Sequence, residues 1–368
     1  MMAIAALWWI LCLAILLGSA GLALLQPVFA RRRAGPPAAL PVSMLIPVKG
    51  APAGLAEATA SVFGQDHPAL EVIFSATRDD EAAASAVRAL LAAAPPGRTL
   101  RFLRTAPAAG INPKIGNLLE SYAAASHDLI IIKDATTILA PGQVDAMLRS
   151  LTPGTGLVCA APIGRGPARM VAHVEAALLN TYGARLLLAA SALGIGVGIG
   201  AIMLFRRGDL DRAGGLAAIA PAVADDHAIS KAMAGLGLRT AFTASAVDQP
   251  LGHRDLQPVW QRHLRWALCR RTAEPLAFWL EPFTGLAAAC LAVWLAFAGP
   301  VLLALTLLAW LTVETALALA KGWPVGPLLL PAILLREALL PVLWIAALLT
   351  RRIVWGDQAV PITSGRRP

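Results

Sequence analysis

Two short stretches of the sequence contain residue types and spacings that could do chemistry. The first is Ala224-Asp-Asp-His227, a pair of acids that opens a helix-like segment. The second has the spacing Q-x-x-R-W, which puts Gln261 and Arg265 on one face of a helix beside Trp266. A carboxylate can accept a proton, and a fixed cation beside an indole can hold an anion and a sugar or base. We therefore expect a site that binds an anionic substrate and removes a proton.

A further group of acids follows the expected strand Glu71–Ser75. Asp79, Asp80 and Glu81 stand just beyond the carboxyl end of that strand. In open α/β sheets this is where ligands bind. The same acids could instead cap the following helix, and the residues alone leave both interpretations open.

Asp134 is placed in the same way, directly after the apolar strand Leu129–Lys133. A turn is its structural alternative. Asp225 and Asp226 could likewise serve only to complement the dipole of the helix that they open. Because all of these acids occur in one chain, we favour a ligand site over three unrelated structural roles.

Alternating strands and helices must position these residues. We expect strands at Met44–Pro47, Glu71–Ser75, Leu100–Leu103, Leu129–Lys133, Gly156–Ala160 and Ala201–Phe205. We expect helices at Gly54–Phe63, Asp80–Ala93, Pro113–Ala125 and Gly142–Leu151. This alternation predicts an α/β fold with a mostly parallel sheet covered on both faces.

A glycine-rich stretch, Gly194-Ile-Gly-Val-Gly-Ile-Gly200, stands out but does not join a strand to a helix in a βαβ unit. A dinucleotide-binding fingerprint is therefore not expected there. We expect the glycines to let backbone segments pack closely, or to line a groove for an apolar substrate.

The composition indicates a membrane protein. Hydrophobic residues make up 57% of the chain and charged residues 14%, which is too apolar for an ordinary soluble protein. The net charge is +9, but the basic residues are scattered or lie at the ends of apolar runs. That placement fits anionic lipid headgroups and not a nucleic-acid partner. The cysteines are far apart and have neither zinc nor disulfide spacing, which indicates a reducing compartment.

The first apolar run, Met2–Leu25, is uncharged and long enough to cross a bilayer. A cleaved signal peptide is less favoured, because the run is long and no basic residue precedes it. Arg31-Arg32-Arg33 follows, so the positive-inside rule places the next region in the cytoplasm. The expected location is a membrane of the bacterial inner-membrane type.

Apolar runs return near the C-terminus, at Phe283–Phe297, Val301–Leu319 and Pro327–Leu349. Arg336-Glu337 interrupts the last run and is expected to face protein or the interface, because an ion pair in lipid is costly. Arg351-Arg352 and Arg366-Arg367 indicate a cytoplasmic tail. Three full spans would leave that tail outside, so one run should be interfacial or re-entrant.

These patterns predict five regions. They are an N-terminal transmembrane helix at 1–26, an α/β domain at 40–258 and an interfacial helix with the Q-x-x-R-W spacing at 259–277. C-terminal transmembrane or interfacial helices follow at 278–350, and a basic cytoplasmic tail at 351–368. The helix around Trp260–Arg271 mixes Trp and Leu with Arg, a composition typical of an interfacial helix. Its alternative is an amphipathic helix packed on the domain.

The chain resembles the ceramide glucosyltransferases, membrane-bound members of glycosyltransferase family 2. An ordered set of motifs at compatible spacings carries this resemblance along nearly the full length: Pro41–Gly50, Gln65–Pro68, Gly110–Leu118, Ala213–Leu216, Ala224–Asp226 and Gln261–Trp266. The resemblance implies a GT-A fold and inverting transfer of a sugar, by default glucose, from a UDP-sugar. The implied acceptor is the primary hydroxyl of ceramide or a similar sphingolipid.

Other functions remain open at this point. A hopanoid glycosyltransferase of the same broad family would use a polycyclic acceptor, and Asn112-Pro113-Lys114 favours the ceramide branch over it. A catalytically inactive domain kept for lipid binding is a third reading, because Asp134-Ala-Thr136 departs from the usual acidic motif. A processive polysaccharide synthase is disfavoured, since the segments after the Q-x-x-R-W motif are few and short.

The resemblance also implies roles for individual residues. Asp226 matches the catalytic base, and Asp134 matches the acid that contacts a Mg²⁺ or Mn²⁺ cofactor. Asp80 falls in the first acidic motif, with Asp79 and Glu81 as near equivalents. The expected contacts to the nucleotide sugar also include residues from the other matching motifs: Lys49, Lys114, Gln261, Arg265 and Trp266. A solvated surface lysine is the alternative for Lys114.

Overall fold

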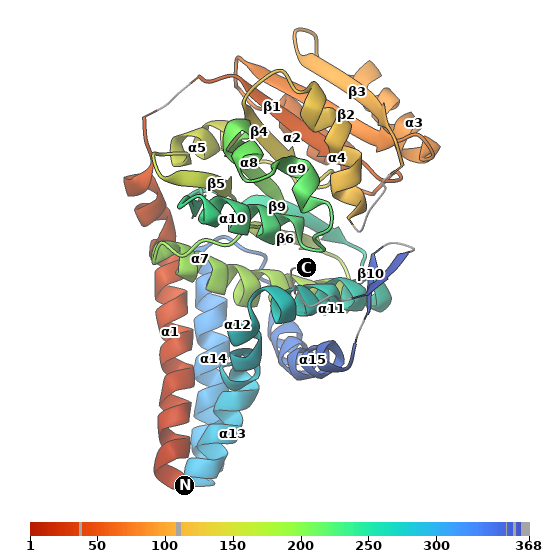
Figure 1. Cartoon of the computed structure of the whole chain (residues 1–368). Coiled ribbons are helices and arrows are strands. Elements are labelled where there is room, and N and C mark those ends of the chain that lie inside the picture. The colour runs from red at the N-terminus through yellow and green to blue at the C-terminus, as the bar shows by residue number, and fades with distance from the viewer. Residues whose placement is uncertain (37–38, 108–111, 351, 356–357, 362–368) are drawn as a thin grey trace. The chain divides into compact units, whose positions relative to one another are not determined.

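The structure, a computed structural model, describes residues 1–36, 39–107, 112–350, 352–355 and 358–361, with side chains as far as residue 350. The chain forms two compact units (Figure 1). We call Leu25–Ile163 with Ala190–Pro250 the sheet unit, and Met1–Leu24 with Gly164–Ala189 and Leu251–Pro368 the helical unit. The chain passes between the units within α1 (Met2–Arg33), β6 (Pro162–Pro167), α7 (Arg185–Ala192) and β9 (Val247–Gly252).

The sheet unit is built on a seven-stranded sheet of order β3-β2-β1-β4-β7-β5-β8. Its strands are β1 (Val42–Pro47), β2 (Leu70–Thr77), β3 (Thr99–Thr105), β4 (Leu129–Lys133), β5 (Thr155–Cys159), β7 (Ile202–Arg206) and β8 (Arg239–Phe242). Its helices are α2 (Leu55–Phe63), α3 (Glu81–Ala92), α4 (Pro113–Ala124), α5 (Gln143–Ser150), α8 (Arg207–Arg212), α9 (Gly215–Ile219) and α10 (Asp225–Gly235). All six strands and four helices expected in this part of the chain are present.

The predicted mostly parallel sheet is confirmed. β1 pairs in parallel with β2 and β4, β2 with β3, and β5 with β8, while β7 runs antiparallel to β4 and β5. The strand order reverses at β1, which lies between β2 and β4. In such sheets the ligand crevice lies at the carboxyl ends of the strands flanking the reversal, here β1 and β4.

The core of the sheet unit explains why its strands are continuous apolar runs. Met44, Phe74, Ile131 and Leu204, from four neighbouring strands, belong to one buried cluster. β4 is buried along its whole length. Strands covered on both faces have no solvent side and therefore lack polar alternation.

The helical unit contains the apolar segments. Its elements are α6 (Met170–Ala177), a π-helical turn (Leu178–Ala184), α11 (Leu256–Ala273), α12 (Pro275–Leu280), a 3₁₀ turn (Glu281–Phe283), α13 (Leu286–Phe297), α14 (Pro300–Ala320), α15 (Leu329–Leu349) and the antiparallel strands β10 (Arg352–Trp355) and β11 (Gln358–Pro361). The two strands lie in the segment expected as a basic tail, of which Arg351, Arg366 and Arg367 fall outside the described residues.

Among the described helices, α1, α14 and α15 are long and apolar enough to cross a membrane. A fourth apolar segment is bent, with 50° between the Pro275–Phe283 part and α13. In Figure 1, α13 and α14 run alongside α1, whereas α15 crosses their direction. The apolar run that we expect to be interfacial or re-entrant is therefore either α15 or the bent segment.

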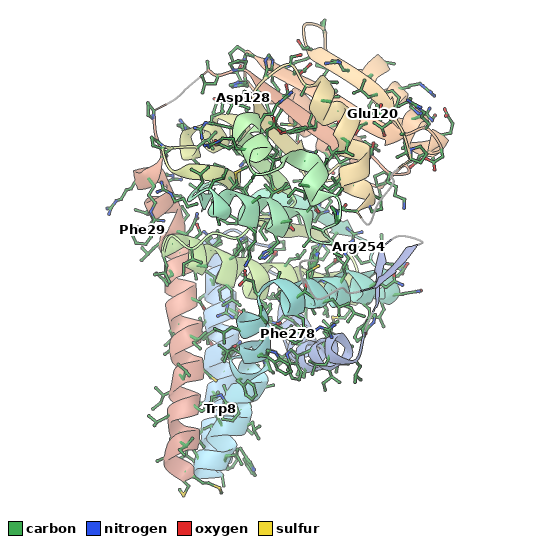
Figure 2. The ribbon with its side chains drawn as sticks, in the orientation of Figure 1. Trp8, Phe29, Glu120, Asp128, Arg254 and Phe278 are labelled. Atoms are coloured by element: carbon green, nitrogen blue, oxygen red, sulfur yellow. The ribbon has the colours of Figure 1, made fainter. Side chains whose placement is uncertain are left out.

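The N-terminal helix packs against the C-terminal apolar helices. Trp8, labelled in Figure 2, donates from Nε1 to the carbonyl of Phe283 over 2.8 Å. Trp9 Nε1 donates to Thr306 Oγ1 over 3.0 Å. Cys12 is buried in the same cluster, beside Trp310 of α14. The indole hydrogen bonds satisfy polar groups that would be costly to leave unpaired in an apolar environment.

Arg336 is fully buried and faces protein, as predicted. Its guanidinium pairs with Glu314 Oε2 at 2.8 Å and with Glu337 Oε1 at 2.5 Å. It also donates to Thr181 Oγ1 over 2.7 Å. Trp310 Nε1 donates to Glu314 Oε1 over 3.0 Å, which completes a hydrogen-bonded network in the apolar unit. A buried charge is tolerated only when it is paired in this way.

Candidate active site

Asp226 stands in the first turn of α10, and both of its carboxylate oxygens are held by backbone N–H groups. Oδ2 accepts from Gly200 over 2.8 Å, and Oδ1 accepts from His227 over 2.8 Å. The N-terminus of a helix also favours negative charge. The side chain is therefore fixed in place and kept available as a carboxylate.

The glycine-rich stretch Gly194–Gly200 forms the wall against which α10 packs. A Cβ on Gly198 would lie 1.9 Å from the Asp226 carbonyl oxygen, and one on Gly196 would lie 2.1 Å from that of Thr240. Neither position leaves room for a side chain. The expected close packing of backbone is confirmed, and it brings the Gly200 N–H to Asp226.

Lys114 lies among carboxylates. Its Nζ is 2.8 Å from Asp134 Oδ1 and 3.0 Å from Asp225 Oδ2, and it donates to the Gly200 carbonyl over 3.4 Å. Burial alone would lower the pKa of Lys114, but the carboxylates of Asp134 and Asp225 outweigh it and raise this pKa above its ordinary value. The surface-lysine alternative is wrong, because the side chain is only 17% exposed. A permanent ammonium therefore sits at the centre of the acidic site.

The Asn-Pro-Lys motif explains how this ammonium is positioned. Asn112 caps α4, accepting at Oδ1 from the N–H of Lys114 over 3.1 Å. Its Nδ2 donates to Asp225 Oδ1 over 3.4 Å and to the carbonyl of Ala222 over 3.1 Å. Pro113 stands at the first helical position, where a missing N–H costs nothing. Asn112 thus ties the starts of α4 and α10 together; the preceding residues Gly110 and Ile111 lie outside the described chain.

The pKa of Asp226 is suited to a base. Burial, and after it the like charge of Asp225, raise this pKa to about 6, while Lys114 opposes the rise. A general base works best when its pKa lies near the working pH. Asp226 is thus ionised at neutral pH and basic enough to accept a proton.

Asp134 follows β4 and has a side chain 43% exposed. The adjacent Lys133 is fully buried and donates to the Asp134 carbonyl over 3.1 Å. Burial lowers the pKa of Lys133 to about 7 against the opposing effect of Asp134. Thr136, two residues after Asp134, accepts at its hydroxyl from Gln249 over 3.3 Å. Sequence reasoning did not assign a role to Lys133, since a lysine at a strand end is usually solvated.

The described residues hold no cluster of three His, Cys, Asp or Glu side chains that could bind a metal. Mg²⁺ and Mn²⁺ at nucleotide sites take one or two carboxylates and complete their shell with phosphate oxygens and water. The partly exposed carboxylate of Asp134 fits such a shared site. The donor set is thus compatible with a cation that arrives with the substrate.

Asp80 has the capping role left open by the sequence, and a second contact besides. Its Oδ1 accepts from Ala83 at the start of α3 over 2.9 Å, and its Oδ2 accepts from the Gly50 N–H over 2.7 Å. Gly50 has φ +62°, a conformation that favours glycine. Asp80 therefore fixes the loop after β1, where Lys49 is exposed.

Asp79 is exposed next to that loop. Hydrogen bonds, chiefly from the Thr77 side chain, lower the pKa of Asp79, and the positive charges of Arg104 and Lys49 act in the same direction. Glu81 pairs with Arg88 at 2.7 Å and with Arg104 at 2.9 Å. The sheet unit thus has one acidic group around Lys114 and another beyond β1 and β2.

Gln261, Arg265 and Trp266 lie in the helical unit, on α11. Trp266 is 37% exposed, and its ring meets the buried ring of His263 edge-on at 4.9 Å between centroids. Burial, with the charges of Arg262 and Arg270, lowers the pKa of His263 to about 3, so this ring is neutral. A neutral aromatic support can hold the Trp266 indole in place without adding charge.

A buried carboxylate that the sequence did not single out anchors α11. Glu175 of α6 is fully buried and pairs with Arg262, while Arg254 Nε lies 3.4 Å away. At the other end of α11, Arg271 donates to the carbonyls of Leu348 and Thr350, each over 3.1 Å. This side of α11 is therefore held to α6 and to the C-terminal end of α15.

Comparison with known proteins identifies the family of this chain. The profile of glycosyl transferase family 21 matches residues 7–367. Ceramide glucosyltransferase 1 of Caenorhabditis elegans is 25% identical over 243 residues, which cover 66% of this chain and 52% of that protein. Ceramide glucosyltransferase of Komagataella phaffii is 29% identical over 160 residues, covering 41% of this chain and 31% of that protein. At best, the chain spans about half the length of these curated relatives.

A solved structure shares the fold. A mannosyltransferase from Pyrobaculum calidifontis, in complex with GDP-Man and Mn²⁺, superposes with a TM-score of 0.50 at 20% identity, covering 93% of this chain and 97% of that one. The predicted GT-A fold is thereby confirmed, as is the predicted likeness to ceramide glucosyltransferases. Because the profile match runs along nearly the whole sequence, the chain belongs to glycosyl transferase family 21.

Proposed function

We propose that this chain transfers a sugar, glucose by family default, from a UDP-sugar to the primary hydroxyl of ceramide or a similar sphingolipid, with inversion. The observation that carries the proposal is Asp226, a carboxylate held by two backbone N–H groups beside the ammonium of Lys114. The family membership and the ceramide glucosyltransferase relatives support the class of reaction.

In the proposed reaction, Asp226 accepts the proton of the acceptor hydroxyl as its oxygen bonds to the anomeric carbon. The bond from that carbon to the diphosphate oxygen breaks, and the nucleoside diphosphate leaves with the electron pair. Attack opposite the leaving group converts an α-linked donor into a β-linked product. With a pKa of about 6, Asp226 is largely ionised at pH 7 and can accept this proton.

The remaining site residues would hold the donor. Lys49, Asp79 and Asp80 stand beyond the carboxyl ends of β1 and β2, where a nucleotide binds in this class of sheet. Arg265 can make paired contacts to phosphate, with Gln261 and Trp266 on the same helix contacting the diphosphate and acceptor. A Mg²⁺ or Mn²⁺ ion held by Asp134 would neutralise charge on the leaving diphosphate.

The lipid acceptor accounts for the apolar helices. Exposing a buried methylene to water costs about 0.8 kcal/mol, so a two-chain lipid cannot leave the bilayer cheaply. The reaction must therefore take place at the membrane surface. Arg31, Arg32 and Arg33 at the end of α1 favour the cytoplasmic face.

The test uses the full chain purified into lipid nanodiscs, given UDP-glucose or other UDP-sugars. Ceramide, a hopanoid alcohol or no added lipid is supplied in separate reactions. We expect a β-linked hexosylceramide, identified by mass spectrometry and by the anomeric coupling in NMR. A product formed only with the hopanoid would show that the acceptor is a hopanoid and not ceramide. An α-linked product would rule out inversion. The absence of a lipid product with every donor would refute the proposal.

A further inference from the structure

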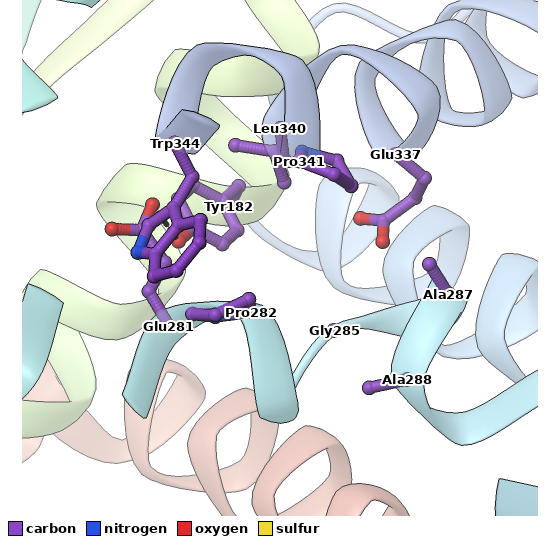
Figure 3. Close-up of a pocket in the computed structure, with 10 residues that line it drawn as sticks. All are labelled: Tyr182, Glu281, Pro282, Gly285, Ala287, Ala288, Glu337, Leu340, Pro341 and Trp344. Atoms are coloured by element: carbon purple, nitrogen blue, oxygen red, sulfur yellow. Dashed lines mark hydrogen bonds between the residues drawn. The ribbon is translucent and has the colours of Figure 1, made fainter. Parts of the chain in front are cut away.

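A small cavity in the helical unit has no role in the chemistry described above. It has a volume of about 30 Å³ and lies between the segment Glu281–Ala288 and one face of α15 (Figure 3). A cavity of this size takes one small polar group. Its walls are mostly apolar, but Tyr182, Glu281 and Glu337 also line it.

The two carboxylates are fixed in place but are not saturated by the described residues. Glu281 accepts from the Tyr182 hydroxyl over 2.7 Å and from Arg270 over 3.0 and 3.1 Å. Glu337 accepts twice from Arg336 and once, at Oε2, from the Leu286 N–H over 2.9 Å. A carboxylate has about four acceptor positions, so each can accept one more hydrogen bond.

Two further features leave room and acceptor capacity beside Glu337. Gly285 lies so close that a Cβ there would be 3.1 Å from Glu337 Oε2. Pro341 lies inside α15 and has no N–H, so the helix does not supply the usual donor to the carbonyl four residues earlier, that of Glu337. The cavity therefore presents oxygen acceptors on more than one side.

The surroundings suit a lipid. Trp344 forms a rigid wall, stacked on Phe278 at 5.6 Å and donating from Nε1 to the Phe278 carbonyl over 2.9 Å. Trp279, Leu280 and Phe283, which flank the cavity residues Glu281 and Pro282 in sequence, are each more than half exposed. Apolar side chains exposed on an apolar helical unit are expected to face acyl chains.

We propose that this cavity binds one donor group of the ceramide head, its amide N–H or its secondary hydroxyl, which donates to Glu337 or Glu281 and leaves the primary hydroxyl for transfer; the inference rests on the proposed function. A neutral head with several donors and no negative charge matches a wall of acceptors. An ionised phosphate group has no hydrogen-bond donor and cannot use these acceptors. Ala287, Ala288, Leu340 and Pro341 would contact the first methylenes of the chains.

The first test fills the cavity without removing a polar contact. Ala287 is exposed and lines the cavity, so Ala287→Phe should fit without disturbing the core. Leu291→Phe, one turn further along α13 at a site 52% exposed, is the matched control. We expect Ala287→Phe to raise the KM for ceramide about tenfold or more with the KM for the UDP-sugar unchanged, and Leu291→Phe to change neither. Equal ceramide KM values for Ala287→Phe and wild type would overturn the site.

A second test needs no variant. Ceramide carrying a diazirine beside its amide is irradiated with the wild-type protein in nanodiscs, without donor, and labelled peptides are mapped by mass spectrometry. We expect labels in 275–297 and 329–349, competed by plain ceramide; labels confined to other segments would refute the site. If wild type transfers no sugar to ceramide but the labels fall here, the proposed function fails and the binding site stands.

Discussion

The backbone N–H of Gly200 donates to Oδ2 of Asp226 over 2.8 Å, so a glycine stretch far from the acidic motif orients the proposed base. The contact depends on Gly198, whose missing side chain lets the stretch approach the start of α10. A glycine-rich segment that looks like a cofactor fingerprint is thus part of the positioning of a carboxylate.

Gly198→Ala should disable the enzyme. Its Cβ would lie 1.9 Å from the Asp226 carbonyl, so α10 or the glycine stretch must move. Overpacking of this kind costs about 1–3 kcal/mol of stability, and the displaced base should lower kcat by about 100-fold. Gly235→Ala, at the other end of α10 with open space around it, is the control and should behave as wild type. Thermal unfolding and transfer kinetics check both; similar kcat values for the two variants would reject the positioning role.

The acid limb of the pH profile should report Asp226. The base must be ionised, so kcat/KM should fall about tenfold for each pH unit below its pKa of about 6. An unperturbed aspartate would place this limb at about pH 4. Transfer rates between pH 4.5 and 8 measure it, and a profile that is flat down to pH 5 would show that Asp226 is not the base.

The effect of Asp226→Asn on stability should depend on pH. The unfolded chain ionises an aspartate at about 3.9, whereas the folded chain does so at about 6. The folded state therefore binds more protons between these values, and wild type loses stability as the pH rises through them. The amide leaves one of the two backbone N–H donors without its acceptor at either pH, so the test is how the Tm difference changes with pH. We expect the Tm of Asp226→Asn, relative to that of wild type, to rise between pH 4 and pH 8. A relative Tm that stays constant or falls over this range would contradict the burial penalty.

Lys114→Met should lower both stability and activity. It removes the ammonium that lies 2.8 Å from Asp134 and 3.0 Å from Asp225, and leaves these carboxylates facing one another. Breaking a buried ion pair from one side costs about 3–5 kcal/mol, and the partial exposure here places the cost at the low end. Adding Asp225→Asn should restore part of the Tm but not the activity. If Lys114→Met alone has the Tm of wild type, the ammonium has no structural role.

Arg336→Met should strongly destabilise the helical unit. Glu314 and Glu337 would lose the guanidinium that pairs with both, at a cost of about 3–5 kcal/mol. Arg336→Lys should rescue only part of this, since a lysine cannot reproduce the paired contacts. Fluorescence-monitored thermal unfolding in nanodiscs ranks the three proteins, and equal Tm values would mean that the network contributes nothing to stability.

Much of the sheet unit could be predicted because its strands are uninterrupted apolar runs. Leu129–Lys133 was predicted with the observed bounds. β6 could not be predicted, because its sequence, Pro-Ile-Gly-Arg-Gly-Pro, has the composition of a loop. Only its pairing with β9 makes it a strand. β8 is short and was likewise not predicted.

The individual site residues could be predicted, but the contacts between their side chains could not. Residue types and order pointed to Asp226, Asp134 and Lys114, whereas the pairing of Lys114 with the acids depends on how α4 and α10 meet. Glu175 was missed for the same reason: a single glutamate in an apolar helix gives no sign that Arg262 will pair with it. Contacts between segments distant in sequence cannot be inferred from local patterns.

The role of Asp226 as the base is tested most directly by comparing wild type, Asp226→Asn and the exposed control Asp66→Asn for donor binding and for sugar transfer to ceramide. Donor binding is measured by calorimetry and transfer by mass spectrometry of the lipid product. We expect unchanged donor binding in all three proteins and loss of transfer, by at least about 1,000-fold, in Asp226→Asn alone. Transfer by Asp226→Asn at the wild-type rate would contradict this role.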